Sequence, residues 1–595
     1  MSGTNIEVRD LLNPDRLAED ISNKHDLWHR KRQPKEEEWS ELNAYVFAID
    51  TTTTTNSQLP WKNKTTLPKL AQIRDNLHAN YMSALFPNDD WMIWEGHSKD
   101  GVLATKRQAI QDYMKNKTRL SGFQKTVSRL LYDYIDYGNA FGDVEYVHEK
   151  HLDPETDELV DGYVGPKAIR RSPYDLVFNP LSPTFEESPK IVRVIYTIGE
   201  LMKRIEDNPE DGYLAEALAQ QMENRHRILS YEHADRLKSD AFVAEGFDSI
   251  HDYYESGHVE LLEFVGDIAD EDGNLRKNRL VTVMDRAKVI RDIPNPAWNG
   301  SDGMCHVGWR LRPDNLYAMG PLDNLVGMQY RIDHLENIKA DLFDFIAHPP
   351  IKIKGNVEAF DWAPFVQIEL GDDGDVEILK VDATALQADT QIAILEQRME
   401  EMAGAPREAM GIRSPGEKTA FEVQKLDNAA SRIFQEKITQ FELFILEPLL
   451  NNMLEIARRN LNTKDVIRVM DDDIGVVQFL DITKEDISSE GKLRAKGASH
   501  FAARNLLVQN LTSVFNSGLG QLITPHISSK KLAKLTEEAF GWNKFDLVKP
   551  NIAIQEQIEM QRMQQSGVDQ LETEQMIAAE EPLEGLMNED DQPIG

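Results

Sequence analysis

The sequence contains a single cysteine, Cys305, among 595 residues. One cysteine cannot form an internal disulfide, and cysteine-poor chains are typical of proteins that fold in a reducing cytoplasm. We expect Cys305 to be a small, partly buried side chain rather than a reactive thiol. The chain also lacks an apolar run of about 18 residues, which a membrane-spanning helix requires. We therefore predict that the protein has no membrane partner.

Residue patterns that carry catalysis are missing as well. The histidines form no His-x-His or His-Glu-x-x-His pair, and there is no Gly-x-Ser-x-Gly elbow. Acidic clusters such as Asp372-Asp373 and 471–473 lack the spacing of a cation site and are typical of solvated turns. We therefore expect no catalytic residue, no metal and no cofactor, and we predict that the chain is not an enzyme.

One segment, GIRSPGEKT at 411–419, is similar to the phosphate-binding loop of nucleotide-binding proteins. It has one residue too many between its second glycine and its lysine. A phosphate loop also follows a strand, whereas the element expected before this segment is a helix. The segment therefore does not predict a nucleotide site.

Positive charge is scarce in this protein. Its 66 Lys and Arg residues are outnumbered by 101 Asp and Glu residues, which gives a formal net charge of −35. Proteins that hold nucleic acid tightly usually carry basic patches, so this chain cannot bind DNA by overall attraction. Any contact with DNA must come from a few local cations. The alternative is that the acidity only supports solubility.

The length of the chain predicts two to four structural units. The spacing of its apolar residues predicts an α+β protein that is predominantly helical. Apolar residues at three- and four-residue steps predict helices at 67–86 and 109–137, and a break at Gly138. Alternation with a period of two predicts strands at 143–147, 191–196 and 261–265. A helical insertion is expected at 198–250.

The region 321–460 has a distinct order of elements. Two amphipathic helices are expected at 321–347 and 385–404. Their apolar stripes are Leu325, Met328, Ile332, Leu335, Ile338, Leu342 and Phe345 in the first, and Ala385, Ala388, Ile392, Leu395, Met399 and Met402 in the second. Between them, 348–384 predicts a small β module ending in a hairpin, in which the turn 371–374 joins 365–370 to 376–381. A long helix at 419–460 follows, with a kink at Pro448.

A short loop carries most of the local positive charge in this region. Arg407, Arg413 and Lys418 lie within twelve residues between Pro406 and the start of the long helix. The loop is either an ordinary connection, whose cations meet neighbouring carboxylates, or a site that contacts an anion. Similarly, the two apolar stripes suit either a buried core or a helix pair packed against copies of itself.

Four segments carry a resemblance to a known family. They are GNAFG at 138–142, RSPYD at 171–175, GWRLRPDNLYAMGP at 308–321 and GIRSPGEKTAFEV at 411–423. Together with the order of elements from about 60 to 460, they resemble the portal proteins of tailed bacteriophages, especially the head-to-tail connectors of short-tailed phages. The similarity is most specific at 305–430.

The resemblance implies the portal fold, in which copies assemble into a ring around a central channel. Residues 1–320 would form the wing, together with part of the long kinked helix at 419–464 that connects wing and crown. The helices 321–347 and 385–404 would form the stem, 348–384 the clip and 405–418 the tunnel loop. Residues 465–550 would form the crown, followed by an acidic, Gln- and Glu-rich tail at 551–595.

The resemblance also implies a function. The ring, a dodecamer in most members, would sit at one capsid vertex of the virion after assembly in the host cytoplasm, and double-stranded DNA would be packaged and ejected through it. The implied partners are terminase, the major capsid protein, scaffolding protein and tail adaptors. Residues that would face DNA are Arg407, Arg413, Ser414 and Lys418 of the tunnel loop, with Lys339, Lys352 and Lys354 as basic residues of stem and clip. The alternatives are another ring-forming virion protein, such as a head-to-tail adaptor, or an acidic metal-dependent hydrolase.

Overall fold

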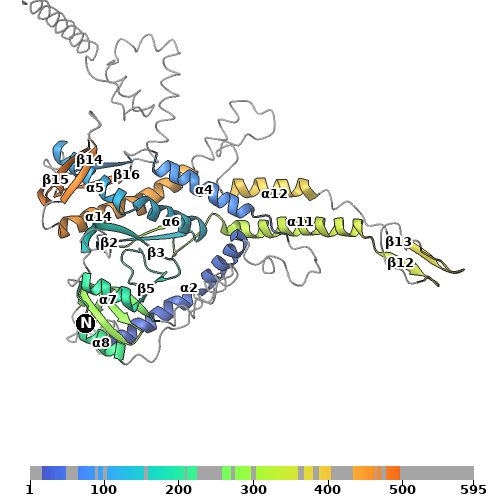
Figure 1. Ribbon diagram of the computed structural model, residues 1–595, viewed down its shortest axis with the longest axis horizontal. Helices are drawn as coiled ribbons and strands as arrows, with labels where there is room; N and C mark the ends of the chain where they lie inside the picture. Colours follow the sequence, from blue (N-terminus) through green and yellow to red (C-terminus); the bar gives the residue numbers. More distant parts are fainter. Residues whose placement is uncertain are drawn as a thin grey trace, which may run out of the picture. The chain divides into compact units, whose positions relative to one another are not determined.

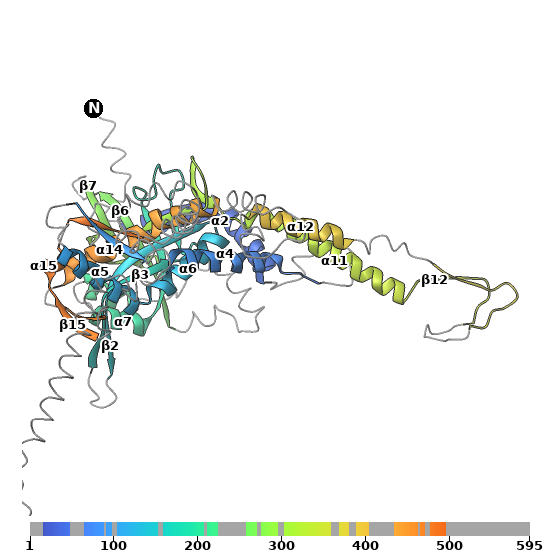
Figure 2. The same cartoon turned by 90° about the horizontal axis from the view of Figure 1, so that it is seen from above.

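A computed structural model gives the architecture of the chain (Figures 1 and 2). It describes residues 16–47, 65–87, 91–97, 104–152, 159–207, 211–223, 257–269, 275–295, 303–358, 368–379, 388–403, 433–461, 465–470, 477–488 and 490–495. The chain forms two compact units, one of Met1–Val469 and Phe479–Phe501, the other of Met470–Gln478 and Ala502–Gly595. Nearly all described residues belong to the first unit. The described residues are 52% helix and 30% strand, which confirms the predicted α+β class, although helix is less dominant than expected.

The largest described sheet is antiparallel, with the strand order β4-β5-β6-β7-β8. Its strands are β4 (Leu176–Phe178), β5 (Lys190–Thr197), β6 (His258–Ala269), β7 (Leu275–Met284) and β8 (Lys288–Pro294). The predicted strands 191–196 and 261–265 pair directly, and Val194 lies opposite Leu261. Trp28 and Ile21 of helix α2 (Leu17–Phe47) share a buried cluster with Phe264 of β6. Helices α7 (Ile198–Asp207) and α8 (Ala215–Glu223) lie in the predicted helical insertion.

A second sheet has the order β3-β2-β9. It consists of β2 (Asn139–Leu152), β3 (Leu159–Arg171) and β9 (Cys305–Gly308). The helices that contact it are α5 (Ala104–Leu120), α6 (Phe123–Asp136) and α14 (Glu447–Asn460), and α4 (Lys69–Leu85) packs against α6. The predicted helices at 67–86 and 109–137 are confirmed, but a turn at Gly122 (φ 69°) divides the second into α5 and α6. The break at Gly138 is confirmed, with φ 67° at that residue.

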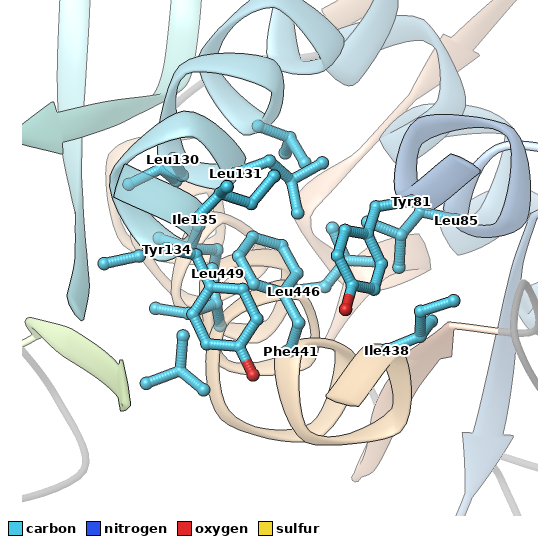
Figure 3. Close-up of a cluster of buried hydrophobic side chains, with 14 of the residues drawn as sticks. Tyr81, Leu85, Leu130, Leu131, Tyr134, Ile135, Ile438, Phe441, Leu446 and Leu449 are labelled. Atoms are coloured by element: carbon cyan, nitrogen blue, oxygen red, sulfur yellow. The ribbon is translucent and has the colours of Figure 1, made fainter. Parts of the chain in front are cut away.

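Large apolar side chains from α4, α6 and the C-terminal helical segments form the main core (Figure 3). Tyr134 of α6 packs against Tyr81 of α4, Trp309 and Phe441, with ring centroids 6.5, 4.9 and 5.4 Å away. Each of these side chains is at most 4% exposed. This core joins segments that are more than 300 residues apart in the sequence.

The long C-terminal helix is irregular in the turn before Pro448. Residues 433–441 are α-helical, Glu442–Leu446 form a π-helical turn (η5), and α14 follows. The backbone N–H of Glu447 bonds to the carbonyl of Glu442, five residues earlier. Proline has no N–H and its ring crowds the preceding turn, so the wider π turn accommodates it. The irregularity predicted at Pro448 therefore lies just before it.

Four two-stranded sheets complete the described architecture. They are β1–β16 (Met92–Gly96, Gly491–Ala495), β10–β11 (Arg310–Arg312, Asn315–Met319), β12–β13 (Ile351–Lys354, Asp375–Ile378) and β14–β15 (Asp465–Met470, Val477–Ile482). The first of them joins part of the segment predicted as crown to the region predicted as wing. The short helix α15 (Lys484–Ile487) contacts α5.

The predicted hairpin within 348–384 has a different pairing. The partner of β13 is β12, with Ile351 opposite Ile378 and Lys354 opposite Asp375. The turn 371–374 bulges from the second strand: the N–H of Gly371 bonds to the Asn356 carbonyl at 3.0 Å. The turn residues were identified correctly, but the expected pairing of 365–370 with 376–381 is wrong. A four-residue Gly-Asp-Asp-Gly turn suits a bulge as well as a hairpin tip, and only the partner strand decides between them.

Candidate functional site

Two helices and a β-ribbon form a part of the chain that we call the arm. Its elements are α11 (Val326–Ala347), α12 (Asp389–Met402), β12 and β13. A short 3-10 turn, η3 (Asp323–Leu325), precedes α11. Figure 1 shows α11 and α12 side by side, with β12 and β13 beyond the C-terminal end of α11. The helices predicted at 321–347 and 385–404 are thus confirmed.

The first half of α11 is anchored by a column of buried polar side chains, Gln329, Asp333 and Asn337, spaced four residues apart. Their side-chain oxygens accept hydrogen bonds from the backbone N–H groups of Leu70, Leu67 and Thr65, at 3.2, 2.9 and 2.7 Å. Burial raises the pKa of Asp333 to about 6, although the Leu67 N–H opposes the shift. The column fixes the segment that leads into α4 along one side of α11.

A buried ion pair anchors α12. The Nζ of Lys69, at the start of α4, lies 2.7 Å from Oε1 of Glu400, and the two side chains are only 8% and 5% exposed. Met399 and Ala403, beside Glu400, are buried in the main core. The C-terminal turn of α12 is therefore held by both charge and apolar packing.

The other end of the arm is exposed and apolar. Leu325, Ile332 and Leu335 of the predicted stripe are buried, but Phe345, at its end, is 50% exposed. Exposed apolar side chains gather at this end: Phe343, Phe345 and Ile346 of α11, and Ile353, Leu370, Ile378 and Leu379 in and around the ribbon. Of the two alternatives for the apolar stripe, a buried core therefore applies to the first half of α11, whereas its last turns are not covered by the described residues of a single chain.

The β12–β13 ribbon has two chemically different faces. Side chains alternate along a strand, so Ile351 and Ile353 share a face with Val376 and Ile378 across the ribbon. Lys352 and Lys354 lie on the opposite face, with Glu377 and Asp375 as their cross-strand neighbours. A lone two-stranded ribbon is marginally stable in water, and this one has an exposed apolar face.

Two of the three predicted basic residues of the arm are engaged with carboxylates. Lys339 donates to Asp389 of α12 at 2.8 Å and to Glu336 at 3.0 Å. These hydrogen bonds, that to Asp389 first, raise the pKa of Lys339. Lys352 Nζ lies 3.1 Å from Glu377 Oε2, and Lys354 is exposed. Lys339 therefore ties α11 to α12. Arg407, Arg413, Ser414 and Lys418 of the predicted tunnel loop lie outside the described residues.

Two of the family-like segments, 138–142 and 308–321, contact each other outside the arm. The GNAFG segment leads into strand β2, which pairs with β9, so that Asn139 lies opposite Gly308. The Oδ1 of buried Asn139 accepts the N–H of Ala318 at 2.9 Å, and the Trp309 N–H bonds to the Gly138 carbonyl at 2.8 Å. A Cβ on Gly138 would lie 2.4 Å from the backbone N of Gly320. These residues thus hold the chain just before η3 and α11.

The RSPYD segment, 171–175, makes contacts that connect several elements. The guanidinium of Arg32, fully buried in α2, donates to the carbonyls of Pro173 and Tyr174 at 2.8 and 2.6 Å and pairs with Glu36 at 2.6 Å. Arg171 pairs with Asp143 of β2 at 2.7 Å. The segment thereby connects α2 with both sheets.

Sequence reasoning missed the residues that anchor the arm. Gln329, Asp333 and Asn337 repeat every four residues beside an apolar stripe, which is the pattern of a polar column facing a partner segment. That signal was available in the sequence. The Lys69–Glu400 pair left no such signal, because its members are 331 residues apart.

Within the described ranges, no group of three or more His, Cys, Asp or Glu side chains could hold a metal ion. Cys305 is buried, as expected, and burial raises the pKa of its thiol. None of the described helices is long and apolar enough to span a membrane. No protein-family model matches this chain, and no curated protein is significantly similar to it.

Proposed function

We propose that this chain is the subunit of a ring that encloses a DNA channel, the portal of a tailed bacteriophage, and that the arms of adjacent copies pack together. The observation that carries the proposal is the exposed apolar end of the arm in a chain of net charge −35. The four family-like segments and the order helix, β module, helix, basic loop, long helix support the same assignment.

The exposed end of the arm favours assembly with other chains. Soluble monomers rarely expose a large contiguous apolar patch, and such patches usually mark interfaces. Burying the remaining half of one side chain such as Phe345 would contribute about 1 kcal/mol. Several such side chains on each copy would offset the repulsion between acidic subunits, which salt also limits to about 8 Å.

The anchoring of the arm suits a rigid channel wall. Asp333 fixes α11, and the Lys69–Glu400 pair fixes α12, so that the two helices have a defined position relative to the core. Lys339 joins the two helices to each other. Copies related by rotation can then meet through the same two faces repeatedly, which is the requirement for a closed ring.

The proposed role is passive. DNA would slide past acidic walls and meet the cations Arg407, Arg413 and Lys418 of the loop, which contact phosphates without reading sequence. Terminase would supply the motor and dock at the β12–β13 end, later followed by tail adaptors. The capsid and scaffolding proteins would contact the remainder of the ring, which we expect to be a dodecamer.

Electron microscopy of the purified protein tests the assembly. We expect rings with a central hole for the natural chain. Phe345→Asp combined with Ile378→Asp should keep the far-UV circular dichroism spectrum of the natural chain and yield monomers by analytical ultracentrifugation. Leu181→Asp is the matched control, because Leu181 is 71% exposed and lies outside the arm. Monomers of the natural chain, or intact rings of the arm variant, would contradict the proposal.

The channel itself requires a second measurement. Arg413→Glu with Lys418→Glu should still form rings but should package little DNA in an in vitro packaging reaction. Normal packaging by this double variant would refute the role of the loop and leave the ring proposal standing.

A further inference from the structure

The α5–α6 segment reverses the charge balance of the protein. Residues 104–136 contain seven lysines and arginines and three aspartates, Asp112, Asp133 and Asp136, which gives a formal charge of +4. The whole chain carries −35. Such a local excess of cations is the electrostatic mark of an anion-binding surface.

Three of these cations lie free on the surface around the turn between the helices: Arg119, Lys125 and Arg129. All three are exposed, and none of them forms a salt bridge with any residue that the structure describes. The arginines of neighbouring elements behave differently. Arg74 of α4 pairs with Asp136 at 2.7 Å, and Arg170 of β3 pairs with Asp133.

The three cations lie within eleven residues of chain around the turn at Gly122, and we call this exposed stretch the α5–α6 basic surface. Lys125 and Arg129 are four residues apart on α6 and therefore lie one turn apart on the same face. Arg119 is in the last turn of α5, and only Leu120, Ser121 and Gly122 separate it from α6. The opposite face of α6 is fixed in the main core by Val127 and other apolar side chains.

The side chains around these cations favour phosphate over a protein partner. Along the chain from 119 to 129, the other exposed residues are Gly122, Gln124 and the single apolar Leu120, and Ser121 and Ser128 are half-buried. The centre of a protein interface is depleted in lysine and enriched in arginine together with aromatic residues and methionine, and no exposed aromatic residue or methionine lies between residues 119 and 129. Phosphate backbones are instead contacted by Arg, Lys, Ser and Gln side chains, as are available here.

We propose that the α5–α6 basic surface binds the phosphate backbone of double-stranded nucleic acid without reading its sequence. This site is separate from the arm and from the loop at 405–418, and binding by it does not require a ring. The acidity of the rest of the chain acts over about 8 Å in physiological salt, so a local cluster can still attract a polyanion. In a ring, the surface would recur once per copy and hold DNA through many weak contacts.

Fluorescence anisotropy with a labelled mixed-sequence DNA duplex tests the site. The variant Arg119→Glu, Lys125→Glu, Arg129→Glu should bind the duplex at least about tenfold more weakly at about 50 mM salt. Three phosphate contacts add about −2.7 to the slope of log K against log salt concentration. Through these contacts, the affinity of the natural chain for the duplex should therefore fall roughly 40-fold between about 50 and 200 mM salt. The variant should lose this component.

A matched control carries the same change of charge elsewhere. Lys203→Glu, Lys277→Glu and Lys288→Glu alter exposed lysines of α7, β7 and β8. This variant should bind DNA within about threefold of the natural chain, because distant charges are screened. Both variants should keep the melting curve of the natural chain.

Several outcomes would overturn the proposal. Equal losses in both triple variants would indicate a general charge effect, and equal binding by all three proteins would place the DNA contact elsewhere. Displacement of the duplex by polyglutamate as effective as by unlabelled DNA would indicate an acidic protein partner instead. Repeating the measurement on the Phe345→Asp, Ile378→Asp variant separates this site from the ring, since each monomer should retain the surface.

Discussion

The buried ion pair between Lys69 and Glu400 provides a sensitive test of how the arm is anchored. Both side chains are almost inaccessible, and their charged atoms are 2.7 Å apart. Replacing Lys69 by methionine keeps much of the side-chain volume but leaves the Glu400 carboxylate buried without this cation. Removing one partner of a buried pair typically costs roughly 3–5 kcal/mol. We expect a loss of that order in the free energy of unfolding for Lys69→Met.

The double variant Lys69→Met, Glu400→Met distinguishes the ion pair from simple packing. Replacing both charges by apolar groups of similar volume is often neutral or stabilising, so the double variant should recover most of the loss. Lys352→Met is the control, because the Lys352–Glu377 pair is about 60% exposed on both sides and should contribute less than about 1 kcal/mol. Urea unfolding followed by circular dichroism measures all of these values.

The result that would refute this reasoning is additivity. If the double variant is destabilised by the sum of the two single variants, the charges do not interact, and the anchoring of α12 rests on Met399 and the apolar core alone. A cost below about 1 kcal/mol for Lys69→Met would lead to the same conclusion.

Two further predictions concern single residues. Asp333 has a pKa of about 6 in the folded chain, above its ordinary value, so its ionisation destabilises the fold as the pH rises from about 4 through 6. Asp333→Asn keeps the acceptor for the Leu67 N–H and should increase the free energy of unfolding at pH 7.5 by up to about 3 kcal/mol. The melting temperature should therefore rise at pH 7.5 but not near pH 4. An equal rise at both pH values would contradict this. Gly138→Ala should destabilise the protein by at least about 2 kcal/mol, because φ is 67° and the new Cβ would meet the backbone of Gly320 at 2.4 Å. Gly199→Ala, where a Cβ meets nothing within 4 Å, is its control, and similar melting temperatures for both variants would disprove the steric argument.

The comparison between sequence and structure is clearest in α11. Its apolar stripe predicts a helix with a buried face, and Leu325, Ile332 and Leu335 confirm this. The same spacing continues to Phe345, which is half exposed. Periodicity predicts that one face of a helix is buried against another surface. Whether that surface belongs to the same chain or to another chain depends on the surroundings of the helix.

Local physics determined the helices, the breaks and the turns of this protein. Gly138 ends a helix because of its own backbone freedom, Pro448 disturbs the turn before it because it lacks an N–H, and the glycines at 371–374 form a turn whatever their partner. These effects act within a few residues, so the sequence alone predicts them.

Only the tertiary structure decided which distant segments meet. The pairing of β12 with β13, the contact of Lys69 with Glu400 and the bond from Asn139 to Ala318 each join residues separated by at least 20 positions. Such contacts depend on the competition among all surfaces of the folded chain, and no local pattern encodes their outcome. The same holds for the cations Arg119, Lys125 and Arg129. The sequence shows their charge, but only the packing of the chain determines that no described carboxylate forms an ion pair with them.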